Sequence, residues 1–139
     1  MLKKGDTYSK TIVFKQEDVE TFARITGDHN PIHTDAQYAA NSSFGRPVVH
    51  GMFAASAFSG VLGMVFPGKG SIVTNRELTF VRPVVVDQEY TMHFKVLETN
   101  HKEHKGLIKS TLKNTKGQAC IVVVSTIINP FAFSSSPKQ

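Results

Sequence analysis

The segment PVVHGMFAASAFSGVLGMVFPG, residues 47–68, contains no Asp, Glu, Lys or Arg. Its length meets the rule for a membrane span, but Pro47 and Pro67 bracket it and it includes His50, two serines and four glycines. A helix buried in a soluble protein is also apolar on all sides. We therefore expect a buried central helix over about 50–65 and no membrane span. Glycine inside a helix is unfavourable by roughly 1 kcal/mol relative to alanine, so the glycines predict a curved sheet packed close to this backbone.

Strand patterns follow the central helix. Residues 71–82 form one candidate strand, and residues 89–97 alternate apolar and polar side chains, which is typical of a strand with one buried face. Residues 107–112 and 118–128 are joined by Asn114-Thr115-Lys116-Gly117, a hairpin turn signal. With a short strand at 11–14, the sequence predicts an α+β fold in which about five antiparallel strands accompany one long helix.

A second helix is expected upstream, over residues 16–26. Its first turn is acidic, which suits the positive end of a helix dipole, and Gly27 is well placed to end it in a left-handed conformation. Pro31 then prevents the loop 28–33 from being helical throughout. Thr34 and Gln37 fit a capping box, which predicts a short helix through about Ala40.

The whole chain of 139 residues has the length of one domain, which we assign to residues 1–129, and residues 130–139 are expected to form a flexible C-terminal tail. The net charge of +5 is spread singly rather than clustered, which argues against a nucleic-acid partner and suits anionic small ligands, an acidic protein or a solvated surface. The single cysteine, Cys120, is expected in the core. The N-terminus has no signal-peptide pattern, so we expect a cytoplasmic protein.

Asp28 and His33 are the strongest candidates for chemistry. General acid–base catalysis needs titratable groups within reach of one small molecule or water, and the rigid Asn30-Pro31 pair between them limits their separation. The alternative is structural: a loop aspartate in an Asx turn, followed by a surface histidine. Spacing alone favours that alternative.

Gly51 is the second candidate, because it lies in the first turn of the central helix. Its N–H has no partner within the helix, the helix dipole adds positive potential, and the missing side chain lets a ligand carbonyl approach. Such an amide could act as an oxyanion hole worth about 3 kcal/mol. A glycine needed only for packing explains the same residue equally well.

Other chemistry receives less support from the sequence. His29 and His33 are four residues apart, but Pro31 keeps them off one helix face and no glutamate follows His29, so no metal site is expected. There is no Gly-rich phosphate loop. Ser56 and Ser59 lack a Gly-x-Ser-x-Gly elbow, which argues against an esterase nucleophile.

Three motifs in order, TGDHNPIHTD at 26–35, FGRPVVHGM at 44–52 and FSG at 58–60, resemble the MaoC-like (R)-specific enoyl-CoA hydratases. The resemblance spans nearly the whole chain. It implies a hot-dog fold, in which a curved antiparallel sheet surrounds the central helix, and a homodimer. It also implies that Asp28 and His33 are the catalytic pair, that the Gly51 amide holds a thioester carbonyl, and that Asn30, His50 and Ser59 support them.

The activity implied by the resemblance is hydration of a trans-2-enoyl thioester to an (R)-3-hydroxyacyl thioester, and the reverse dehydration, in fatty acid metabolism. Asp28 would take a proton from water and His33 would help return one to the α-carbon. No metal or redox cofactor is implied, since coenzyme A or acyl carrier protein carries the substrate. The alternatives are a hot-dog acyl thioesterase and a catalytically silent acyl-thioester binding or dimerisation module.

Overall fold

The computed structural model describes residues 1–134, which form one antiparallel sheet, one long helix and three shorter helices. In chain order the elements are β1 (Thr7–Val13), α1 (Gln16–Thr26), α2 (Pro31–Thr34), α3 (Ala36–Ala40), α4 (Gly51–Met64), β2 (Ile72–Phe80), β3 (Glu89–Asn100), β4 (Lys105–Lys113) and β5 (Ala119–Ile128). The strand order is β1-β3-β4-β5-β2, and every neighbouring pair is antiparallel.

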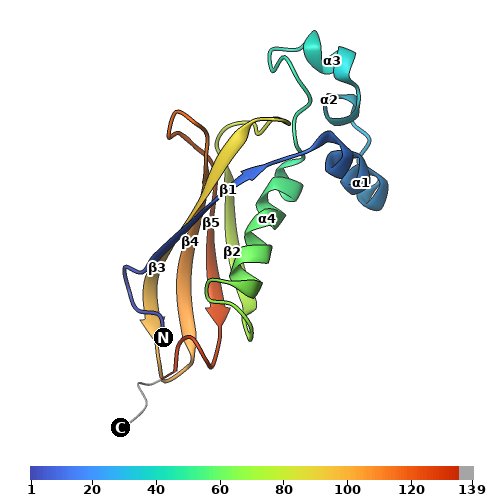
Figure 1. The fold of residues 1–139 in the computed structure, drawn as a ribbon. Helices are drawn as coiled ribbons and strands as arrows, with labels where there is room; N and C mark the ends of the chain where they lie inside the picture. The colour runs from blue at the N-terminus through green and yellow to red at the C-terminus, as the bar shows by residue number, and fades with distance from the viewer. Residues whose placement is uncertain (135–139) are drawn as a thin grey trace.

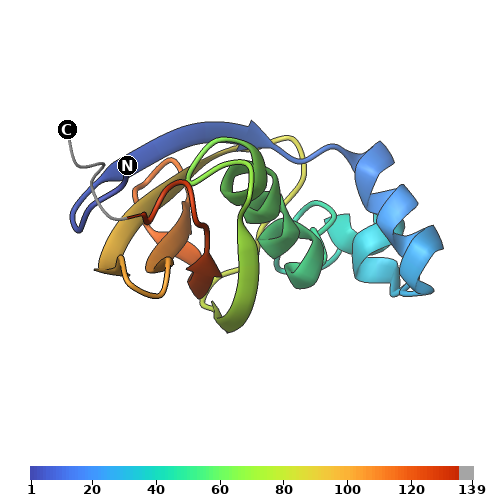
Figure 2. The ribbon, with the colours of Figure 1, turned by 90° about the horizontal axis from the view of Figure 1, so that it is seen from below.

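The sheet curls around α4, as seen along the strands in Figure 2. The face of α4 toward the sheet carries Ala54, Ala55, Phe58, Val61 and Leu62, all buried. They meet the alternate, inward side chains of the strands, because successive side chains of a strand point to opposite faces. This is the predicted hot-dog arrangement, and the central helix, the hairpin at 114–117 and buried Cys120 are confirmed.

Two of the three glycines of α4 do not serve the packing predicted for them. A Cβ added at Gly60 or Gly63 would meet no atom within 4 Å, so both positions face away from the sheet. The buried positions of α4 that face the sheet include Ala54 and Ala55. The face of α4 away from the sheet, which carries Gly60 and Gly63, is therefore uncovered by the described residues and has few large side chains at these positions. We call it the free face of α4.

The helices before α4 gather at its N-terminal end (Figure 1). α1 runs over the predicted residues and ends at Gly27 with φ 81°. The cap of α3 is one residue later than the capping-box pattern predicted: Asp35 accepts from the N–H groups of Gln37 and Tyr38, both at 3.0 Å. A carboxylate that accepts two amides outcompetes the neighbouring Thr34 hydroxyl for this role. The one-turn helix α2, which begins at Pro31, was not predicted.

The segment after β5 packs against the sheet rather than trailing away as expected from residue 130. Phe133 is fully buried and its ring fills the space above Gly106, where an added Cβ would come within 2.1 Å of it. Asn129 holds the turn, since its Oδ1 accepts from the amides of Phe131 and Ala132. The serines that follow Phe133 made the segment read as a flexible tail, so the sequence did not reveal that Phe133 is buried. Residues 135–139, the rest of the predicted tail, lie outside the described residues.

Among the described residues, no helix is long and apolar enough to cross a membrane.

Candidate active site

The loop between α1 and α2 is held by its own side chains. The Thr26 hydroxyl accepts from the amide of Asp28, and Asp28 Oδ1 accepts from the amide of Asn30, both at 3.2 Å. Asn30 then caps α2 by accepting from Ile32, and Pro31 occupies the first helical position, where no N–H is needed. Asn30 therefore orders the segment that carries Asp28 and His33, and its supporting role in the site stays a prediction.

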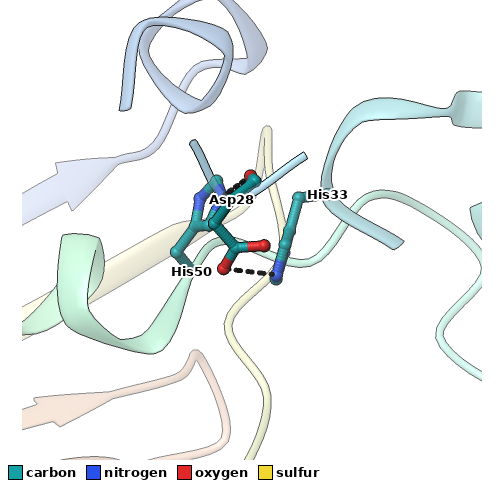
Figure 3. Close-up of side chains that lie close together, drawn as sticks. All are labelled: Asp28, His33 and His50. Atoms are coloured by element: carbon teal, nitrogen blue, oxygen red, sulfur yellow. Dashed lines mark hydrogen bonds and ion pairs between the residues drawn. The ribbon is translucent and has the colours of Figure 1, made fainter. Parts of the chain in front are cut away.

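Asp28 and His33 face each other, as the sequence predicted (Figure 3). His33 Nε2 lies 3.9 Å from Asp28 Oδ2, and the His33 side chain is 13% exposed against 52% for Asp28. The other ring nitrogen, Nδ1, is 2.6 Å from the carbonyl oxygen of Val48. A carbonyl only accepts, so Nδ1 carries a hydrogen, and in the neutral ring Nε2 presents a lone pair toward Asp28.

His50 connects both members of this pair. Its ring stacks on His33 with centroids 3.9 Å apart, and its Nε2 donates to the backbone carbonyl of Asp28 at 3.0 Å. The Phe22 ring packs against it with centroids 4.9 Å apart, and His50 is only 3% exposed. As the residue preceding α4, His50 ties the beginning of the central helix to the loop that carries Asp28.

Gly51 opens α4 next to the pair, and two hollows meet at it. One, of about 270 Å³, is lined by Asp28, His33, His50 and Gly51 together with apolar neighbours. The other, of about 310 Å³, reaches from His33 and Gly51 along apolar side chains of the segment 80–84 and Ile121. An acid–base pair thus borders the same space as the free amide end of a helix and an apolar wall.

The space above Gly51 is filled by a residue that the sequence did not single out. A Cβ at Gly51 would lie 2.8 Å from the Phe80 ring, which is itself 52% exposed. Nothing local to Phe80 marks it, because its contact with Gly51 joins β2 to the beginning of α4. Phe22 and the Val48 carbonyl were also missed, because they meet the two histidines only through tertiary contacts.

Ser59 does not reach the pair within this chain. It lies two turns along α4, where its hydroxyl accepts from Arg76 Nη1 at 3.1 Å. Burial lowers the pKa of Arg76 below its ordinary value. A supporting role for Ser59 therefore stays a prediction.

A metal ion would have to bind Asp28, His33 and His50, whose nearest ligand atoms lie within 4.8 Å of one another. The geometry suits it poorly. The two imidazoles stack at an interplanar angle of 26°, so their nitrogen lone pairs do not converge on one point, and His33 Nδ1 and His50 Nε2 already bond to carbonyls. Without converging donors, the cluster is better suited to hold water.

Comparison with known proteins agrees with this geometry. The family of MaoC like domains matches residues 3–118. An (R)-specific enoyl-CoA hydratase of Aeromonas caviae is 40% identical over 83% of this chain and 85% of its own, and a 3-hydroxybutyryl-CoA dehydratase of Methylorubrum extorquens is 38% identical over 93% and 80%.

The solved structure of an (R)-hydratase from A. caviae involved in PHA biosynthesis superposes with a TM-score of 0.87 at 33% identity, covering 93% of this chain and 98% of that one. The chain belongs to the MaoC-like domain family.

Proposed function

We propose that this protein is a hydro-lyase that adds water to a trans-2-enoyl thioester to give the (R)-3-hydroxyacyl thioester, and catalyses the reverse dehydration in fatty acid metabolism. The observation that carries the proposal is the meeting of the Asp28–His33 pair and the Gly51 amide at one hollow. The relatives named as (R)-specific enoyl-CoA hydratase and 3-hydroxybutyryl-CoA dehydratase support the same chemistry.

The Gly51 amide polarises the substrate. It donates to the thioester carbonyl oxygen, which gains negative charge when a nucleophile attacks the β-carbon. The positive end of the α4 dipole stabilises the same charge. The Gly51 amide borders the same hollow as the Asp28–His33 pair, so a carbonyl bound there lies within its reach.

Asp28 and His33 hold the nucleophile. Their facing atoms are 3.9 Å apart, which is too far for a direct hydrogen bond and suits a bridging water that donates one hydrogen to each. As the water oxygen bonds to the β-carbon, Asp28 takes one hydrogen as a proton. His33 holds the other and keeps the water oriented.

The resulting Asp28 carboxylic acid returns its proton to the α-carbon on the same face, which restores the carboxylate. Since Nε2 of neutral His33 carries no hydrogen, Asp28 rather than His33 is the group able to complete this step. This assignment differs from the one expected from the sequence, in which His33 returned the proton. No cofactor takes part in these steps, and coenzyme A or acyl carrier protein serves as the handle.

The assembly that we propose is a homodimer. Within the described residues one side of β2 has no strand neighbour, and the free face of α4 next to it combines open glycines with exposed apolar side chains. The large exposed ones at this edge are Met52, Met64, Ile72 and Phe80, each more than half exposed. A contiguous apolar surface of this kind is typical of an interface between chains.

The decisive experiment compares two readouts on one enoyl thioester. Loss of the conjugated enoyl absorbance without release of free thiol is the expected result. Release of thiol would identify a thioesterase, and neither change would identify a binding module. Chiral analysis of the hydrated product must give the (R) isomer.

A further inference from the structure

The outer face of the sheet carries a basic hollow that the proposed reaction does not use. Phe94, Ile108 and Leu112 point into the core, so the side chains next to them in β3 and β4 point away from α4. Together with residues of β1 and β5 they surround a hollow of about 460 Å³. Its cationic or titratable lining residues are His93, Lys95, Lys109 and Lys113. No carboxylate of the described chain lines it.

Two of the lysines that line the hollow are placed where their like charges repel each other. Lys95 and Lys109 lie directly opposite each other in the β3–β4 register. Like charges in this position destabilise a sheet. The ion pairs of the described residues involve other lysines, at positions 3, 4, 15 and 105, so none of the three lysines in the hollow is neutralised by a neighbouring carboxylate.

Hydrogen-bond donors accompany these charges on the same rows of the sheet. Thr7 lies opposite Lys95, and His93 lies between Ser9 and Thr111. The Ser9 hydroxyl is 2.9 Å from His93 Nδ1. Burial, and then the Lys113 charge, lower the pKa of His93 below its ordinary value. The hollow is thus both electropositive and partly shielded from water.

We infer that this hollow binds a small molecule bearing phosphate groups, whose oxygens are bound by Lys95, Lys109 and Lys113 and by the hydroxyls between them. Several ammonium and hydroxyl donors on rigid strands match the many acceptor oxygens of a phosphate. The volume falls within the range of about 300–1,000 Å³ that small-molecule sites occupy. Val122 and Ala119 add an apolar wall for the remainder of the ligand. Since the site lies across the sheet from α4, this inference does not depend on the proposed activity.

Nuclear magnetic resonance of the His93 ring provides the test, with inorganic pyrophosphate and ADP as probes. We expect saturable shifts of the His93 signals and a rise in the pKa of His93, because a bound anion stabilises the imidazolium. Lys95→Gln and Lys109→Gln should each weaken binding by about tenfold, the effect of losing one charge-assisted contact. Lys102→Gln removes the same charge outside the hollow and should change nothing.

Tighter binding of ADP than of pyrophosphate would show that the organic part rests on the Val122 side, and equal binding would show that phosphate alone is recognised. The inference is overturned if sodium chloride at matched ionic strength produces the same shifts. It is also overturned if both folded lysine variants, checked by circular dichroism, bind the probes as the parent protein does.

Discussion

At the scale of single residues, the chemistry depends on the gap between His33 and Asp28. Because His33 Nδ1 donates to the Val48 carbonyl, the two facing atoms, His33 Nε2 and Asp28 Oδ2, are both hydrogen-bond acceptors. Two acceptors 3.9 Å apart cannot bond to each other, but a water molecule between them can donate to both. The catalytic role proposed for the pair depends on partners that hold each residue in place. The Asn30 side chain caps α2, the helix that carries His33. His50 Nε2 donates to the backbone carbonyl of Asp28.

Asp28→Asn tests the proton transfer directly. The amide keeps the shape of the side chain but cannot take and return a proton, so kcat/KM for hydration should fall by about 10³, within the usual range for a general acid–base group. The free energy of unfolding should be unchanged, because the Asp28 side chain is half exposed. His29→Gln alters the adjacent exposed residue and serves as the control. Unimpaired turnover by Asp28→Asn would refute the assignment.

His50→Phe separates the stacking role of His50 from its hydrogen bond. The phenyl ring can still pack between Phe22 and His33, while the donor to the Asp28 carbonyl is lost. Losing one buried hydrogen bond, worth about 1 kcal/mol, should lower kcat by about fivefold to tenfold with little change in KM. If kcat stayed constant while only the unfolding free energy fell, His50 would be a purely structural residue.

At the scale of elements, the N-terminus of α4 presents the Gly51 amide and lies against the Phe80 ring of β2. The sequence left two explanations of Gly51 open, room for a ligand and room for packing. The structure supports the packing explanation, because the Phe80 ring occupies the position that a Cβ would need. Room for a ligand at the Gly51 amide stays a prediction. Steady-state kinetics of two variants can distinguish them.

Gly51→Ala should impair activity and strain the contact with Phe80. Adding Phe80→Leu removes the close ring atoms, so the double variant should recover the unfolding free energy. If catalysis requires a residue without a side chain at position 51, kcat of the double variant stays low, since the methyl group is still present. Phe80→Leu alone is the matched control. Recovery of kcat together with stability would show that Gly51 is needed only for packing.

The elements themselves were largely predictable from local patterns. α1 with its Gly27 cap, α4 and the strand alternation of β3 follow from hydrophobic periodicity and cap chemistry, which act within a few residues. The pair Asp28–His33 was found because one stiff loop carries both residues. Phe80, Phe133 and the Val48 carbonyl were not found, because tertiary contacts between segments separated in the sequence bring them into place.

Phe133→Ala tests the unpredicted anchor after β5. Removing a fully buried phenyl ring leaves a cavity above Gly106, and the free energy of unfolding should fall by about 3 kcal/mol in urea denaturation. Phe131→Ala removes a ring that is 75% exposed and should have a much smaller effect. Equal stability of the two variants would return residues 130–134 to the status of a loose tail.

At the scale of the whole molecule, the two faces of the sheet and the two sides of α4 have different characters. The outer face of the sheet is basic and rich in hydroxyl groups. The exposed side of α4 and the edge of β2 are apolar, and the side of α4 also carries glycines. Glycine at an open helix position is unfavourable by about 1 kcal/mol relative to alanine, and no contact within the described chain accounts for it at Gly60 or Gly63. The proposed partner chain, packed against this backbone, would account for it.

Gly60→Leu distinguishes a monomer from a dimer, because it should stabilise a monomer slightly but disrupt a dimer that packs on this face. In a monomer the leucine meets only open space and is the better helix former, so the free energy of unfolding should rise slightly. In a dimer packed on this face the same side chain overfills the interface, so the particle mass measured by light scattering should fall to that of one chain. Thr21→Leu places a leucine on the exposed surface of α1 and should leave the mass unchanged. A Gly60→Leu protein that kept the mass of two chains would place the interface elsewhere, and the open glycines would then lack an explanation.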